Sequence, residues 1–200
     1  MTQSAPLRFL PPEEAARANL YGLIARLFYA APDAGLISEL LRAQPIEGEG
    51  ELALAWREMV EACRVAFPAQ LESEHTELFI GTGKALVTPY LSHYVLRHAN
   101  DNPLVQIRAQ LAAWGIARRE GVPEYEDHIS GICETMRFAI AAQQRSPEEQ
   151  QVFFDRFVYR GASAFCDAVS ASNQARFYKV VARFARAFFE VEKNAFEMAG

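Results

Sequence analysis

The spacing of apolar residues is the feature that most constrains the fold of this chain. From Pro12 to Tyr29, apolar side chains recur every three or four positions, which is the period of an amphipathic helix. The same period returns in later segments, namely residues 36–41, 52–63, 71–79, 104–114, 129–140 and 177–191. No segment alternates apolar and polar residues for long enough to predict a strand. The sequence therefore predicts an all-α fold.

Capping and turn residues predict where several of these helices begin and end. Asp33 is placed to cap a helix that starts after it, and Ser146 with Glu149 has the spacing of a capping box. Gly161 is expected to interrupt the helix that follows this box, because glycine is a poor helix former. We expect the last helix to begin near Asn173.

One long irregular segment divides the predicted helices into two groups. Residues 81–89 contain two glycines and a proline, which disfavour regular structure. We predict one helical group over approximately residues 12–80 and a second over 90–198, the latter opening with a helix near residues 91–98. Half of the 200 residues are apolar, so the whole chain, residues 1–200, is expected to form a single domain.

Charge and hydrophobic content limit the kinds of partner that this chain can bind. A formal net charge of -5 argues against a large phosphate-binding surface, so nucleic acid is not an expected partner. The first residues lack the pattern of a secretory signal, and no stretch approaches the roughly 18 apolar residues of a membrane span. We therefore expect a cytoplasmic protein that does not insert into membranes. The three cysteines fit no disulfide or metal scheme and are expected to pack in the core.

Glutamate and histidine side chains offer one alternative function. Glu72 and His75 have the spacing of one half of the ligand set found in di-iron helical bundles. His93 lacks a glutamate at the offset that the second half requires. A small helical metal carrier or enzyme that uses Glu72, His75 and His93 stays open as an alternative, although we predict no resident metal or other cofactor.

A group of acidic residues precedes another predicted helix, near residues 127–143. Glu124, Glu126 and Asp127 lie beside His128, after a break that contains a proline. Asp127 has the chemistry of an N-cap, with His128 as a residue of the helix start. The same carboxylates would also suit an arginine-bearing peptide, because carboxylates and guanidinium groups pair through two hydrogen bonds. Residue spacing alone does not choose between these interpretations.

Two segments together carry a resemblance to a known family. Residues 77–94, ELFIGTGKALVTPYLSHY, resemble a hallmark of the TorD/DmsD family of redox-enzyme maturation chaperones, in which LFxG precedes a PPY-type loop and x-S-x-Y. The residues that fit this hallmark are Leu78, Phe79, Gly81, Pro89, Tyr90, Ser92 and Tyr94. Glu124, Asp127 and His128 match the second hallmark, E-P-x-D-H. Thr88 and Tyr125 stand where the family pattern has proline.

The resemblance implies an all-helical chaperone rather than an enzyme. Such a chaperone binds the twin-arginine leader peptide or the apo form of a molybdenum-containing oxidoreductase subunit, and it assists cofactor insertion, folding and assembly before export. The ten matching residues would form the client site, in which apolar and aromatic groups hold the leader's hydrophobic stretch and Glu124, Asp127 and His128 meet its basic end. A monomer or an exchange-type dimer is expected. An assembly adaptor for an enzyme that is not exported is a further alternative.

Overall fold

A computed structural model describes residues 10–81, 83–95, 102–117, 121 and 123–199. Within these ranges the chain forms α-helices, two π-helical segments (η1 and η3) and a 3-10 turn (η2). In chain order they are α1 (Pro12–Tyr29), α2 (Ala34–Arg42), α3 (Glu51–Arg64), α4 (Pro68–His75), η1 (Thr76–Ile80), η2 (Leu91–His93), α5 (Pro103–Ala113), α6 (Ile129–Ala141), α7 (Pro147–Phe153), η3 (Phe154–Tyr159), α8 (Arg160–Ala171) and α9 (Phe177–Ala199). None of the residues described belongs to a β-strand, and the prediction of an all-α fold is confirmed.

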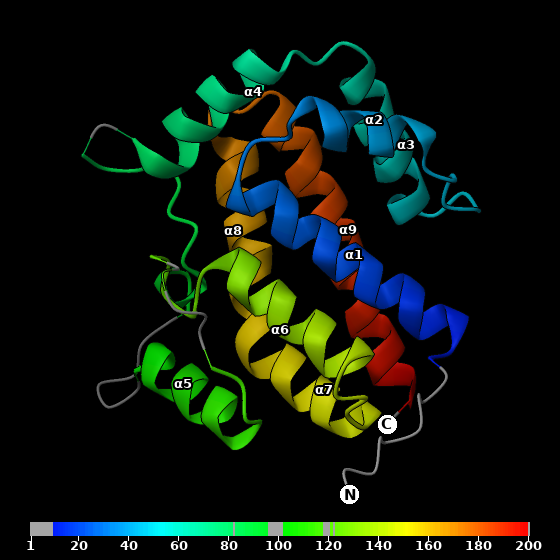
Figure 1. Cartoon of the computed structure of the whole chain (residues 1–200), viewed down its shortest axis with the longest axis vertical. Helices are drawn as coiled ribbons and strands as arrows, with labels where there is room; N and C mark the ends of the chain where they lie inside the picture. Colours follow the sequence, from blue (N-terminus) through cyan, green and yellow to red (C-terminus); the bar gives the residue numbers. More distant parts are fainter. Residues whose placement is uncertain (1–9, 82, 96–101, 118–120, 122, 200) are drawn as a thin grey trace, which may run out of the picture.

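The helices pack in an order that mixes early and late parts of the chain. Helices α1, α6, α8 and α9 lie side by side through the middle of the molecule (Figure 1). At one end α3 and α4 pack against α9, and α2 packs against α3, whereas α5 and α7 lie toward the other end. Because α1 contacts α6 and α3 contacts α9, helices from both sides of residues 81–89 share one hydrophobic core.

Aromatic rings fill the part of this core where α1, η1, α8 and α9 meet. The ring centroid of Phe28 lies 5.0 Å from that of Phe165 and 5.9 Å from that of Phe79. Phe79 in turn lies 5.0 Å from Tyr178, and all three pairs meet edge to face. Such a pair stabilises a core by about 0.5–1.5 kcal/mol beyond the burial of its surface. This cluster fixes η1 against the long helices.

A buried ion pair joins α1 to α9. Arg17 donates two hydrogen bonds to the carboxylate of Glu192, at 2.8 and 2.7 Å. The Tyr21 hydroxyl donates to the same carboxylate at 2.9 Å, and the side-chain oxygen of Gln150 on α7 accepts from Arg17 at 3.1 Å. Glu192 is only 2% exposed, so its charge is tolerated because these donors surround it. The network therefore fixes the register of α1, α7 and α9.

Capping residues act where the sequence predicts them. The Asp33 carboxylate accepts a hydrogen bond from the backbone N–H of Leu36 at 2.7 Å, at the start of α2. Ser146 and Glu149 make both hydrogen bonds of the capping box that opens α7. The boundaries of α2 and α7 are thus set by local interactions.

The last helix begins at Phe177 rather than near Asn173. Glu74, which lies on α4, is the physical reason. Its carboxylate accepts hydrogen bonds from the backbone N–H groups of Arg176, Phe177 and Tyr178 at 2.8, 3.2 and 2.9 Å. These groups have no partner within a helix that starts there, so a carboxylate from another helix selects the starting position.

The three cysteines are free thiols that lie in the interior, at Cys63, Cys133 and Cys166. Burial raises the pKa of Cys63 to about 11 and that of Cys166 to about 12, which disfavours the reactive thiolate. Among the helices described, none is long and apolar enough to cross a membrane.

Gly161 does not interrupt a helix, contrary to the expectation from its low helix propensity. Helix α8 runs through it, directly after η3. A Cβ atom at this position would lie 2.8 Å from Cβ and 2.9 Å from the carbonyl oxygen of Leu91. Glycine is therefore required because the turn at η2 approaches the backbone of α8.

We predict that Gly161→Ala lowers the free energy of unfolding by about 1–3 kcal/mol, although alanine is the better helix former. Chemical denaturation measures this loss. Gly22→Ala is the matched control, because its added Cβ would meet only the side chain of Arg137, with Cδ at 2.7 Å, and that flexible side chain can move. Equal stabilities of the two variants would contradict the proposed contact.

Candidate functional site

The two segments that carry the family hallmarks meet in space. Tyr90 and His128 form an isolated antiparallel bridge. The backbone N–H of Leu91 donates to the carbonyl of Asp127 at 2.8 Å, and that of Ile129 donates to the carbonyl of Pro89 at 2.9 Å. We call this contact between residues 89–92 and 127–129 the junction. It explains why the helix expected over residues 91–98 is only the short turn η2, since the backbone before it pairs across to the start of α6; residues 96–98 lie outside the described residues.

Side chains reinforce the junction on both sides. The Ser92 hydroxyl donates to the carboxylate of Asp127. The Tyr94 hydroxyl donates to the carbonyl of Thr88 at 2.9 Å, which holds the ends of the turn together. Asp127 is 3% exposed, so in this structure its carboxylate is buried in the protein interior.

His128, not Asp127, is the N-cap of α6. Its Nδ1 accepts a hydrogen bond from the backbone N–H of Ser130 at 3.1 Å, and the helix begins at Ile129. The interpretation of Asp127 as a helix cap is therefore wrong, and the carboxylate is left to bind Ser92. Burial, followed by the charge of nearby His75, lowers the pKa of His128 to about 4. A neutral ring is consistent with its role as an acceptor.

Tyr90 is the half-buried centre of an aromatic group at the junction. Its ring centroid lies 5.4 Å from that of His128 and 6.0 Å from that of Tyr125. Burial, and then the carboxylates of Glu124 and Asp127, raise the pKa of Tyr90. The local environment is thus aromatic and negatively charged.

Tyr125 contributes a surface that the sequence did not predict. In the sequence it stands only as a departure from the family pattern, in place of proline. In the structure it is 55% exposed beside Tyr90. A large aromatic residue in a loop, outside any helical period, was the available signal.

Gly81 ends η1 in a conformation that only glycine adopts easily. Its φ is +66°, and a Cβ atom there would lie 2.2 Å from the carbonyl oxygen of Lys84. The N–H of Val87 then donates to the carbonyl of Leu78 at 2.9 Å, which returns the chain toward the junction. Gly81 thus sets the path of the chain between η1 and η2.

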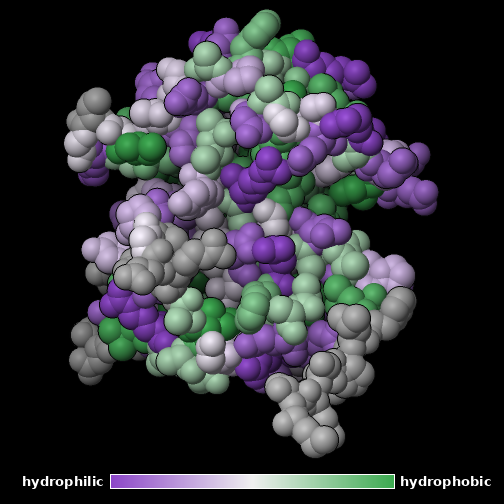
Figure 2. All heavy atoms as spheres, in the orientation of Figure 1, coloured by the Kyte–Doolittle hydropathy of each residue, from purple (hydrophilic) through white to green (hydrophobic). Residues whose placement is uncertain are grey.

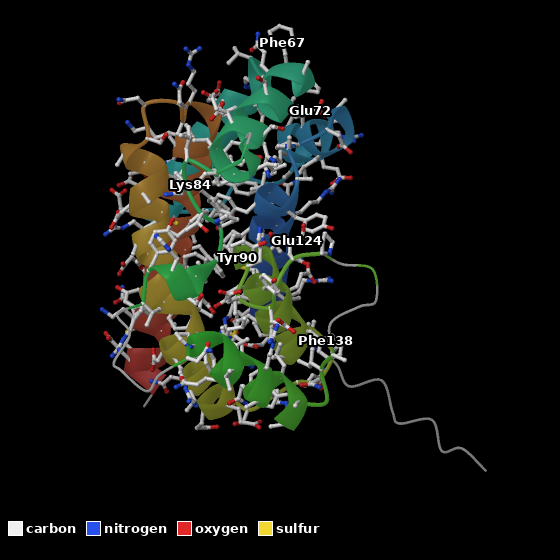
Figure 3. The ribbon with its side chains drawn as sticks, turned by 90° about the vertical axis from the view of Figure 1, so that its left-hand side faces the viewer. Phe67, Glu72, Lys84, Tyr90, Glu124 and Phe138 are labelled. Atoms are coloured by element: carbon white, nitrogen blue, oxygen red, sulfur yellow. The ribbon has the colours of Figure 1, made fainter. Side chains whose placement is uncertain are left out.

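The ten predicted site residues divide by burial. Five lie in the interior and five are partly exposed. The buried ones are Leu78, Phe79, Pro89, Asp127 and His128, and the partly exposed ones are Gly81, Tyr90, Ser92, Tyr94 and Glu124. All except Leu78, Phe79 and Gly81 belong to the two short segments 89–94 and 124–128. Figure 3 shows Tyr90 and Glu124 close together on one face of the molecule.

The residues of the alternative metal site do not lie together as ligands. His75 is buried, and its Nε2 lies 3.4 Å from the carbonyl oxygen of Phe28, whereas Glu72 and His93 are exposed. Burial lowers the pKa of His75. Within the described part of the chain, no three His, Cys, Asp or Glu side chains are grouped as metal ligands would be.

Comparison with known proteins assigns the family. A family model described as "Nitrate reductase delta subunit" matches residues 47–190, which include both hallmark segments. The chain belongs to the nitrate reductase delta subunit family. The resemblance to TorD/DmsD maturation chaperones is confirmed, because curated relatives of the chain are TorD proteins.

Two curated relatives are chaperones rather than enzymes. Chaperone protein TorD of Photobacterium profundum is 27% identical over 151 residues, which cover 69% of this chain and 70% of the relative. Chaperone protein TorD of Shewanella loihica is 25% identical, over 92% of this chain and 94% of the relative. A crystal structure of an Archaeoglobus fulgidus protein assigned to redox enzyme maturation has the same fold, with a TM-score of 0.56 at 18% identity over 94% of this chain and 99% of that one.

We predict that His128 makes this family member less stable in acid. Its folded-state pKa of about 4 lies below the value near 6.5 expected in the unfolded chain, so only the unfolded state takes up a proton between these values. Stability is therefore present above about pH 6.5 and is lost as the pH falls toward 4, by up to about 3 kcal/mol. His128→Asn keeps a capping oxygen but cannot titrate. Urea unfolding at about pH 7.5 and about pH 4.5 should show a smaller loss in this variant, and equal losses would contradict the prediction.

Proposed function

We propose that the chain is a cytoplasmic chaperone for a molybdenum-containing oxidoreductase subunit. It binds the subunit's twin-arginine leader, its apo form or both, and it assists cofactor insertion, folding and assembly before export. Family membership and the TorD relatives support a maturation chaperone. The net charge of -5 is compatible with a basic leader as ligand.

The junction is the observation that carries this proposal. It joins residues that are far apart in the sequence, and it uses both hallmark segments, through Leu91 and Asp127 and through Pro89 and Ile129. Backbone pairing to the start of α6 holds a short turn at a fixed place, although the turn belongs to no sheet. Such a rigid turn is suited to present side chains for binding.

We propose that the ten site residues contribute in two ways. The buried ones, among them Phe79 and Asp127, form the framework that supports the turn. The partly exposed ones contact the client, with Tyr90 and Glu124 at the centre and Tyr125 beside them. Aromatic faces next to carboxylates suit a peptide that carries arginine and apolar residues together.

A second candidate is an assembly adaptor for an enzyme that is not exported. The family's description names a subunit of an enzyme, which fits a protein that assembles with its client. The two candidates differ in the client's first residues. Capture of the client on the purified chaperone, followed by sequencing of the client's N-terminus, separates them. A client that binds equally well without a twin-arginine leader supports the adaptor.

We predict that Tyr90→Ala weakens leader binding by more than about fivefold, because it removes a central aromatic contact. Isothermal titration with a synthetic peptide that carries two adjacent arginines and an apolar segment measures the affinity. Tyr29→Ala is the control, since Tyr29 is a tyrosine at the C-terminal end of α1 that is 52% exposed. Circular dichroism checks that both variants fold. Unchanged affinity in Tyr90→Ala would place the peptide elsewhere.

A further inference from the structure

An arginine of the chain itself binds the turn that leads into α6, residues 125–128, which we call the acidic turn. This turn is closed by a hydrogen bond from the backbone N–H of His128 to the carbonyl of Tyr125 at 3.0 Å. Arg108, on α5, reaches across to it, and its Nε donates to Oε2 of Glu126 at 3.1 Å. Its Nη2 lies 3.1 Å from the same oxygen. The free protein therefore already holds a guanidinium group at this turn.

The carboxylate of Glu126 is fixed in place and is largely shielded from water. Its side chain is 15% exposed, whereas that of Arg108 is about half exposed. The carbonyl of the next residue, Asp127, takes part in the junction, so the junction fixes the acidic turn. On the other side of Glu126, the ring centroid of Tyr125 lies 6.0 Å from that of Tyr90. Glu126 is thus a fixed acceptor beside the aromatic pair.

The ion pair of Arg108 and Glu126 has a weaker geometry than a two-point contact between arginine and a carboxylate. Both nitrogens of Arg108 meet one oxygen of Glu126, at 3.1 Å. In the buried pair of α1 and α9, by contrast, two nitrogens of Arg17 bind two different oxygens of Glu192 at 2.8 and 2.7 Å. Bonds between these groups are strongest in that paired arrangement. A second arginine that approaches from solvent can therefore compete for Glu126.

Helix α5 does not depend on this ion pair for its position. Ile107, Leu111 and Trp114 are buried. The ring of Trp114 stacks on that of Phe153 with centroids 4.9 Å apart, and its carbonyl accepts a hydrogen bond from the side chain of Gln143 at 2.7 Å. The ion pair can thus open while the helix stays in place, since an exposed ion pair adds little to stability.

The exposed side of α5 carries an apolar group next to the ion pair. Val105 lies one helical turn from Arg108 and is more than half exposed. Figure 2 shows hydrophilic and hydrophobic residues next to each other over α5, at the lower left. A segment that brings an arginine to Glu126 would therefore meet an apolar neighbour as well.

We propose that Arg108 is an internal competitor of the client. In the free protein its guanidinium group occupies the carboxylate of Glu126, and an arginine of the client takes its place when the client binds. This inference rests on the proposed function and concerns the regulation of that site. Because one ion pair replaces another, Arg108 weakens the binding of the client's arginine and keeps the carboxylate paired until the client arrives.

Four proteins separate this role from a general effect of charge: the wild type, Arg108→Gln, Glu126→Gln and the double variant. Each is titrated with a peptide that carries two adjacent arginines and an apolar segment, and with the same peptide carrying glutamines in place of the arginines. We expect Arg108→Gln to bind the arginine peptide about two- to fivefold more tightly than the wild type, with no change for the glutamine peptide. The gain should shrink at high salt, because salt screens the competing pair.

Glu126→Gln removes the carboxylate for which the two arginines compete. In this background, Arg108→Gln should bring no gain in affinity. Arg26→Gln is the matched control for the lost charge, because Arg26 is exposed to the same degree and pairs with Glu39 at 2.8 Å. This control should bind the arginine peptide as the wild type does, and circular dichroism checks that each variant folds.

The outcomes separate this inference from the function on which it rests. Equal or weaker binding of the arginine peptide by Arg108→Gln, compared with a wild type that binds it, overturns the inference and leaves the proposed function standing. A gain that persists in the Glu126→Gln background assigns the effect to net charge and also overturns the inference. No binding of that peptide by the wild type or by Arg108→Gln overturns both.

Discussion

Most of the site depends on a contact of two backbone hydrogen bonds and one side-chain bond between residues 89–92 and 127–129. Leu91 and Ile129 each donate to a carbonyl of the other segment, and Ser92 donates to buried Asp127. Leu91 and Ile129 are the first residues of η2 and α6, so their N–H groups have no partner within those helices, and without this pairing they would need water or another acceptor. The junction therefore fixes the position of an otherwise irregular stretch of the chain, which includes Tyr90.

The surrounding helices restrict how far the junction can move. Gly161 allows α8 to approach Leu91, and the aromatic cluster around Phe79 anchors η1. The buried pair of Arg17 and Glu192 holds α1 against α9. A client is therefore expected to bind side chains already in place, rather than to open the core, since opening would expose the buried charge and rings.

Helical periodicity predicts the fold well, because each helix buries one apolar face. Capping by Asp33 and by Ser146 with Glu149 was also predictable, since both partners lie within one turn of sequence. The predictions that failed concern features that are set by residues far away in the sequence. Glu74 sets the start of α9 from another helix, and Gly161 is in α8 because of Leu91. The residues of the candidate site were proposed from the family resemblance, which carries no information on burial. Asp127 was therefore expected to face a client, whereas its carboxylate is buried and accepts a hydrogen bond from Ser92.

The most direct test of the junction is a double-mutant cycle of Ser92→Ala and Asp127→Ala, with unfolding free energy and leader-peptide affinity measured on each protein. We predict that either single change costs about 1–3 kcal/mol of stability and weakens peptide binding, because Tyr90 loses its support. The double variant should lose little more than the worse single variant, since both changes remove the same bond. Additive losses of stability, with peptide affinity unchanged throughout, would contradict the view that this contact holds the binding site together.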